Sequence, residues 1–196
     1  MTEENKVEGV DWYQKHRPRK FRDVIGQEEA IGQLSAMLKT GFPKALLLTG
    51  GSGVGKNTLG RILKNKLGCL DGNYQEEDCA AVDGAIDLVR GVKRMMPQVP
   101  LGGGVRIWLW DECQAFSRLP QAANSMLKML EETPPFVYHF LCTTNPEKLL
   151  KAIRTRSKQV KLKELTPDGI KQVVQRIANL EQVKLSNAVL NAIAEA

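Results

Sequence analysis

The chain has 196 residues, of which 42% are hydrophobic and 26% are charged, a composition typical of soluble globular proteins. This length allows one α/β domain and part of another. No apolar run approaches a membrane span, and the first residues lack the apolar core of a signal peptide, so we expect a cytoplasmic protein with no membrane partner.

Lysine and arginine outnumber aspartate and glutamate by 28 to 22, which gives a net charge of +6. This charge permits a polyanionic partner, and a merely basic surface is the alternative. The four cysteines contain no C-x-x-C pair, so we expect reduced thiols that are mostly buried. They are Cys69, Cys79, Cys113 and Cys142.

The N-terminal 26 residues begin polar and then carry aromatic residues among basic ones. Because Pro18 prevents a long helix here, we expect an arm that wraps over a domain edge. A helix is expected over residues 27–41, where Ile31, Leu34 and Leu38 recur on one stripe.

A glycine-rich loop between an apolar strand at 45–49 and a helical pattern is the strongest functional signal. In a Gly-x4-Gly-Lys loop, backbone N–H groups and the helix N-terminus point at one anion, and Lys56 reaches the β- and γ-phosphates. An ordinary glycine-rich loop is the alternative. The residues expected to bind the nucleotide are Gly50, Gly51, Ser52, Gly53, Val54, Gly55, Lys56, Asn57 and Thr58.

The position after Lys56 departs from the phosphate-loop pattern. A Ser or Thr hydroxyl normally ligates Mg²⁺ there, and this chain has Asn57. An amide oxygen can coordinate Mg²⁺ only if it fits a tight octahedral geometry. The sequence therefore leaves hydrolysis open and makes Asn57 a candidate metal ligand.

The stretch after the loop helix is expected to form turns at 68–78 and a short strand at 79–82. A helix at 85–96 follows, with apolar residues on one side and Arg90, Lys93 and Arg94 on the other. Such a basic stripe suits a helix that packs on a sheet and faces phosphates, and a solvated helix face is the alternative.

Residues 105–110 predict a buried strand that ends in Asp111 and Glu112. We expect this strand to lie beside strand 45–49, which would bring both carboxylates to the γ-phosphate. Asp111 would then hold Mg²⁺, and Glu112 would orient and deprotonate the attacking water. An acidic turn is the alternative.

The remaining chain predicts an amphipathic helix at 119–130 and a buried strand at 136–142. Asn145 follows that strand, where it could bridge the catalytic water and the γ-phosphate or form an Asx turn. A fifth strand is expected at 158–162. Two amphipathic helices after residue 164 predict the start of a helical subdomain.

Four stretches together resemble the AAA+ clamp-loader ATPases, of the gamma/tau and replication factor C small-subunit type. They are residues 15–28, 53–56, 110–112 and 124–135. The resemblance implies a P-loop AAA+ module at 1–164, with a five-stranded parallel sheet flanked by helices. It also implies that residues 165–196 are the truncated beginning of a helical lid domain.

Site roles follow from the same resemblance. Asn145 matches the sensor-1 position, and Arg156 matches an arginine finger that reaches the γ-phosphate on a neighbouring subunit. The segment that borders the adenine is matched by Arg17, Pro18, Val24 and Ile25.

The implied function is an ATP- and Mg²⁺-binding subunit that, in an oligomeric assembly, loads a sliding clamp onto primed DNA for replication. Its expected partners are other clamp-loader subunits, the clamp and primed DNA, whose phosphates would face Arg90, Lys93, Arg94 and Arg118. Zinc is not expected, because the family's four-cysteine insertion is missing. The alternatives are a scaffold subunit that donates Arg156 without hydrolysing ATP, or another AAA+ nucleic-acid remodeller.

Overall fold

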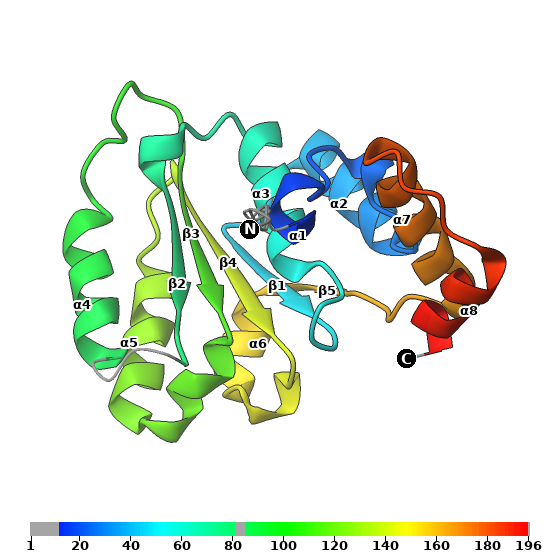
Figure 1. The fold of residues 1–196 in the computed structure, drawn as a ribbon. Coiled ribbons are helices and arrows are strands. Elements are labelled where there is room, and N and C mark those ends of the chain that lie inside the picture. The colour runs from blue at the N-terminus through cyan, green and yellow to red at the C-terminus, as the bar shows by residue number, and fades with distance from the viewer. Residues whose placement is uncertain (1–11, 81–84, 196) are drawn as a thin grey trace, which may run out of the picture.

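The computed structural model describes residues 12–80 and 85–195, and its centre is a five-stranded sheet of order β2-β3-β4-β1-β5 (Figure 1). All four neighbouring strand pairs are parallel, which confirms the expected five-stranded parallel sheet. The strands are β1 (Ala45–Thr49), β2 (Tyr74–Asp78), β3 (Arg106–Asp111), β4 (Val137–Thr143) and β5 (Lys158–Lys161).

Helices cover both faces of this sheet, with α2 and α3 on one side and α4 and α5 on the other (Figure 1). The helices are α1 (Trp12–Lys15), α2 (Glu28–Thr40), α3 (Lys56–Lys66), α4 (Ala85–Met95), α5 (Pro120–Glu131), α6 (Lys151–Arg156), α7 (Pro167–Leu180) and α8 (Asn187–Glu195). Short 3₁₀ turns are η1 (Phe21–Asp23), η2 (Asp71–Asn73), η3 (Cys113–Arg118) and η4 (Pro146–Lys148).

The core forms two layers because side chains alternate along each strand. In β1, Leu47 packs with the layer under α4 and α5, whereas Leu46 and Leu48 pack with the layer under α2 and α3. All five residues of β1 are buried, as expected for a central parallel strand covered on both faces.

The sequence-based prediction that strand 105–112 lies beside strand 45–49 is wrong, because β4 lies between β1 and β3. The acidic end of β3 nevertheless reaches the phosphate loop, since α3 packs over β3 and β4. Gly60 permits this approach: a Cβ at Gly60 would lie 2.4 Å from Leu109 Cδ1 of β3.

The predicted position of the edge strand β2 was also wrong. The chain forms β2 at Tyr74–Asp78, where turns were expected, while Cys79 and Ala80 form a turn and residues 81–82 of the predicted strand lie outside the described residues. β2 is an edge strand with exposed Gln75, Glu76 and Asp78, so it lacks the apolar pattern of a buried strand.

The two C-terminal helices pack against each other, and α7 and the residue after it contact the N-terminal arm. Arg176 of α7 donates to the backbone oxygen of Asp23, and Glu181 accepts from both Lys15 and His16. The Thr166 side chain caps α7 by accepting from Gly169 N, as the sequence indicated. A domain boundary at residue 164 stays a prediction.

The four cysteines are buried and free of disulfides, as expected. Burial raises the pKa of the Cys113 and Cys142 thiols well above the usual range, so both stay protonated. Within the described residues, no helix is both long and apolar enough to span a bilayer.

His139 is buried in the middle of β4 between two tryptophans. Its Nδ1 accepts from Trp110 Nε1 at 3.2 Å, its ring stacks on Trp108, and its Nε2 has no partner. Burial lowers the pKa of His139 to about 3, because a charged imidazolium would have no solvent around it.

We therefore expect acid to destabilise the fold through His139. Between pH 6.5 and pH 3 the unfolded chain binds a proton at this residue and the folded chain does not, so the free energy of unfolding falls as pH falls. From pH 7 to pH 5 this loss amounts to about 2 kcal/mol. Urea unfolding of wild type and His139→Gln, which keeps an acceptor for Trp110, measures it. Parallel pH profiles for the two proteins would contradict this assignment.

Candidate functional site

The phosphate loop occupies the turn between β1 and α3. Gly50, Gly53 and Gly55 all have positive φ angles, of 148°, 74° and 101°, which side-chain-bearing residues rarely adopt. A Cβ at Gly50 would also lie 2.8 Å from the backbone oxygen of Leu162. Three of the four glycines that the sequence assigned to phosphate binding are therefore also required by this backbone.

Lys56 begins α3 and is 6% exposed. Its Nζ donates to the backbone oxygens of Gly50 and Gly51 at 2.9 and 2.6 Å. These carbonyls hold the ammonium over the loop, within the space where an anion would be bound by the loop N–H groups.

Asn57 follows in the first turn of α3 and links the loop to β3. Its Nδ2 donates to Asp111 Oδ2 at 2.5 Å, and the other carboxylate oxygen of Asp111 accepts from Glu112 N at 3.0 Å. The remaining amide atom, Asn57 Oδ1, is buried and has no hydrogen-bond partner. A buried oxygen without a donor is an unfilled acceptor.

These two side chains suit a magnesium ion. Mg²⁺ is usually held by one or two carboxylates together with waters and substrate phosphates. Asp111 supplies a carboxylate, and the unpartnered Asn57 Oδ1 supplies a neutral oxygen next to it. The orientation of the Asn57 amide, fixed by Asp111, leaves the oxygen rather than the nitrogen available to a cation.

Glu112 sits in a left-handed backbone conformation, with φ 46° and ψ 41°, at the start of η3. Only two non-glycine residues of the described chain have a positive φ, and such conformations concentrate at functional sites. The turn directs the Glu112 carboxylate toward the end of β4. There its Oε2 accepts from Gln114 Nε2 and from Thr144 Oγ1, the latter at 3.1 Å.

Gln114 joins this carboxylate to the tip of β4. Its Nε2 also lies 3.2 Å from Thr144 Oγ1, and its Oε1 accepts from Thr143 Oγ1 at 2.6 Å. Thr143 Oγ1 in turn accepts from Asn145 N at 3.0 Å. Neither Gln114 nor Thr144 was expected from the sequence, where only the Thr-Thr-Asn run after a buried strand could have pointed to them.

One cavity of about 390 Å³ collects six of the nine predicted phosphate-loop residues together with Asp111 and Glu112, whereas Gly50, Gly51 and Val54 do not line it. Tyr13 of α1 also lines it, which places the N-terminal arm at the phosphate loop. Thr58, which was assigned to the nucleotide, is buried and faces this cavity as well. The lining residues are Tyr13, Ser52, Gly53, Gly55, Lys56, Asn57, Thr58, Asp111 and Glu112.

Other predicted site residues lie outside that lining. Asn145 lies two residues after the end of β4 and immediately before η4, and within the described chain its side-chain amide makes no hydrogen bond. Arg156 ends α6, where its guanidinium pairs with Glu131 Oε1 at 2.6 Å. Both groups are about half exposed, at 42% and 45%, so the pair is open to solvent.

The four residues expected to border the adenine lie in different surroundings. Arg17 and Pro18 line a separate cavity beside α3 and β2. Val24 packs against the core layer under α2 and α3, and Ile25 is half-buried.

The predicted DNA-facing residues are solvent-accessible but not all free. Arg90 lies 3.5 Å from Asp87, and Lys93 pairs at 2.7 Å with Glu132, the residue after α5. Arg94 and Arg118 are exposed and belong to no ion pair of the described chain.

The chain is similar in sequence to known subunits of DNA polymerase III. The sequence family described as DNA polymerase III, delta subunit, matches residues 83–166. The tau/gamma subunit of DNA polymerase III from Haemophilus influenzae is 32% identical over 203 residues, covering 93% of this chain and 29% of the relative. The gamma/tau subunit from Mycobacterium tuberculosis is 30% identical over 200 residues, covering 90% and 34%. The chain thus spans about a third of these relatives.

The fold is shared with a mutant of RuvB from Thermotoga maritima, with a TM-score of 0.74 and 21% identity over 92% of this chain and 60% of that one. This match confirms the expected P-loop AAA+ fold. Together the matches confirm the resemblance to the AAA+ clamp-loader ATPases, since over almost its whole length the chain is similar in sequence to DNA polymerase III gamma/tau subunits.

Proposed function

We propose that the chain is a clamp-loader subunit that uses ATP binding and hydrolysis to help place a sliding clamp on primed DNA. The observation that carries this proposal is the convergence of Asp111 and Glu112 on the phosphate-loop cavity. A loop alone supports nucleotide binding. Two carboxylates beside it add the groups that phosphoryl transfer to water requires.

In this proposal the loop N–H groups and Lys56 hold the β- and γ-phosphates. Lys56 Nζ then exchanges the carbonyls of Gly50 and Gly51 for phosphate oxygens, which are charged and therefore stronger acceptors. Glu112 accepts a proton from the attacking water, and Asn145 orients that water. Gln114 and Thr144 position Glu112 through the hydrogen bonds to its Oε2.

Asp111 and Asn57 would hold Mg²⁺ through a carboxylate oxygen and the unpartnered Oδ1. The ion would neutralise charge on the β- and γ-phosphates. Nucleotide and Mg²⁺ are thereby the expected cofactors.

Arg156 would act on the ATP of a neighbouring subunit. Its present partner, Glu131, is exposed, and a surface ion pair is worth only about 0–1 kcal/mol, so a phosphate can displace it. Hydrolysis in this proposal depends on assembly with other clamp-loader subunits. DNA phosphates would meet Arg94 and Arg118, and Arg90 and Lys93 once their acidic partners release them.

A second candidate is a scaffold subunit that binds nucleotide, or none, and only donates Arg156. Asn57 favours it, because the usual metal-ligating hydroxyl is missing. A third candidate function, another type of AAA+ remodeller of nucleic acid, is also compatible with the fold.

Replacing Lys56 with alanine should weaken nucleotide binding. A hydrogen bond to a charged group contributes about 1.5–3 kcal/mol, which is roughly 10- to 150-fold in affinity. Fluorescence titration with a fluorescent ATP analogue measures this loss. Lys66→Ala, an exposed lysine at the end of the same helix, is the control and should bind like wild type. Equal affinity for Lys56→Ala would refute the phosphate-loop assignment.

Steady-state hydrolysis by the assembled subunits, with DNA and clamp, separates the motor from the scaffold. For a motor, wild type hydrolyses ATP and Glu112→Gln lowers kcat by about 10²-fold or more while still binding nucleotide. For a scaffold, wild type shows only background hydrolysis, and Asn57→Thr raises it by orders of magnitude by restoring the hydroxyl. That second pattern would sink the motor proposal.

Thr144 tests whether the β4 tip positions Glu112. Thr144→Val removes the donor at nearly constant volume and should lower kcat roughly tenfold, the size expected for one hydrogen bond to a carboxylate. The KM for ATP should not change, because Thr144 does not line the phosphate-loop cavity and its hydroxyl bonds only to the Glu112–Gln114 network. Thr144→Ser keeps the hydroxyl and should restore kcat. If Ser and Val behave alike, Thr144 acts only through packing.

A further inference from the structure

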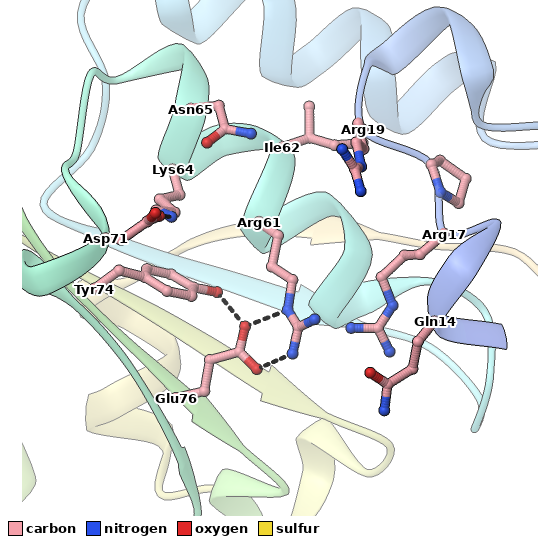
Figure 2. A pocket seen from close by; sticks show the side chains of 11 residues that line it. Gln14, Arg17, Arg19, Arg61, Ile62, Lys64, Asn65, Asp71, Tyr74 and Glu76 are labelled. Atoms are coloured by element: carbon pink, nitrogen blue, oxygen red, sulfur yellow. Dashed lines mark hydrogen bonds and ion pairs between the residues drawn. The ribbon is translucent and has the colours of Figure 1, made fainter. Parts of the chain in front are cut away.

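A second cavity, of about 670 Å³, lies between the N-terminal arm, α3 and β2 (Figure 2). Six charged residues line it. They are Arg17 and Arg19 of the arm, Arg61 and Lys64 of α3, and the acids Asp71 and Glu76. Four cations and two carboxylates give this lining a net charge of +2. Arg17 and Pro18 were expected beside the adenine, but none of the residues to which the proposed phosphate, metal and water steps are assigned lines this cavity.

The two carboxylates are already taken by the two α3 cations. Arg61 holds Glu76 with two parallel bonds of 2.5 and 2.6 Å, and Tyr74 Oη donates to the same carboxylate at 2.7 Å, as the dashed lines in Figure 2 show. Burial raises the pKa of Glu76, but the donors outweigh it and the pKa is lowered. Lys64 pairs with Asp71. The α3 side of the cavity is thus neutralised within the chain.

The arm side is neutralised less, because Glu76 attracts the Arg17 guanidinium from beyond ion-pair distance and already pairs with Arg61. No ion pair of the described residues includes Arg17 or Arg19, and Arg17 Nε is buried without a hydrogen-bond partner. The Arg17 guanidinium lies 4.5 Å from the centre of the Tyr13 ring, so the arm itself holds it in place. In Figure 2 the guanidinium groups of Arg17 and Arg61 point into the same space. Unpaired donors beside a second cation create a demand for an anionic acceptor.

The basic character continues along the arm beyond the cavity. Lys20 and Arg22 are exposed, and within residues 12–80 and 85–195 the one ion pair of Arg22 is with Asp23 at 3.9 Å. A row of cations on an extended segment fits a chain of phosphates better than a single small anion. On α4, by contrast, Arg90 and Lys93 are engaged by Asp87 and Glu132.

We propose that the arm and this cavity bind the phosphate backbone of a nucleic-acid strand, with one phosphate held between Arg17 and Arg19. The contacts are to phosphates alone, so binding is independent of sequence and falls with salt. The site is separate from the phosphate loop, and nucleic acid binds here without ATP.

Fluorescence anisotropy with a labelled single-stranded oligonucleotide, in the absence of nucleotide, tests the proposal. The test variant is Arg17→Gln/Arg19→Gln. The charge-matched control is Lys39→Gln/Lys184→Gln, which removes two exposed cations on α2 and in the α7–α8 connection. Each lost phosphate contact should reduce the slope of log K against log salt by about 0.7, and affinity near 0.1 M salt should fall about tenfold or more. The control should change affinity less than about twofold.

Chemical protection gives an answer that needs no variant. Bound oligonucleotide should protect Lys20 from acetylation and leave Lys39 and Lys184 reactive. Thermal unfolding of each variant shows whether the fold is kept.

Three results would overturn the proposal. An unchanged salt slope for Arg17→Gln/Arg19→Gln would exclude these phosphate contacts. An equal loss in the control would assign binding to net charge. A glutamate-rich peptide that binds as tightly as the oligonucleotide, and is lost with the same two arginines, would assign the cavity to an acidic protein segment.

Discussion

The close approach of α3 to β3 is the constraint on which the candidate site depends. The phosphate loop follows β1, and the acidic pair follows β3, with β4 between them. Gly60 has no side chain to hold α3 away from Leu109, and Asn57 then bonds Asp111 at 2.5 Å. Without that approach, the loop and the two carboxylates would line different parts of the sheet edge, and no single cavity would contain both.

Much of the fold could be predicted from the sequence, because apolar runs and periodicity identify buried strands and amphipathic helices directly. β1 was placed at its observed bounds, and β3, β4 and β5 within one or two residues. The order of the strands could not be derived this way, since periodicity says which face of a strand is buried and not which neighbour it has. β2 was missed because its exposed acidic side chains resemble a turn.

The residues of the candidate site likewise fall into those that the sequence could predict and those that it could not. Residues that act through the backbone or through a motif, such as Gly50, Gly55 and Lys56, were visible in the sequence. The positioning of Glu112 was not. It arises from a left-handed residue that aims the carboxylate at Gln114 and Thr144, which are two and 32 positions away along the chain. Such contacts are set by a backbone angle, and the amino-acid types alone do not reveal it.

The sequence does not reveal which cations are paired with acids in the folded chain. On α4 the sequence shows a basic stripe, yet two of its three cations have acidic neighbours, one of them the residue that follows α5. On the arm, Arg17 and Arg19 belong to no ion pair of the described chain, and Arg17 keeps a buried donor unfilled. A cation already paired must exchange one anion for another when it binds phosphate, whereas an unpaired one gains an interaction outright. The sign and number of charges are therefore a weaker guide to a polyanion surface than the pairing of each charge in the folded chain.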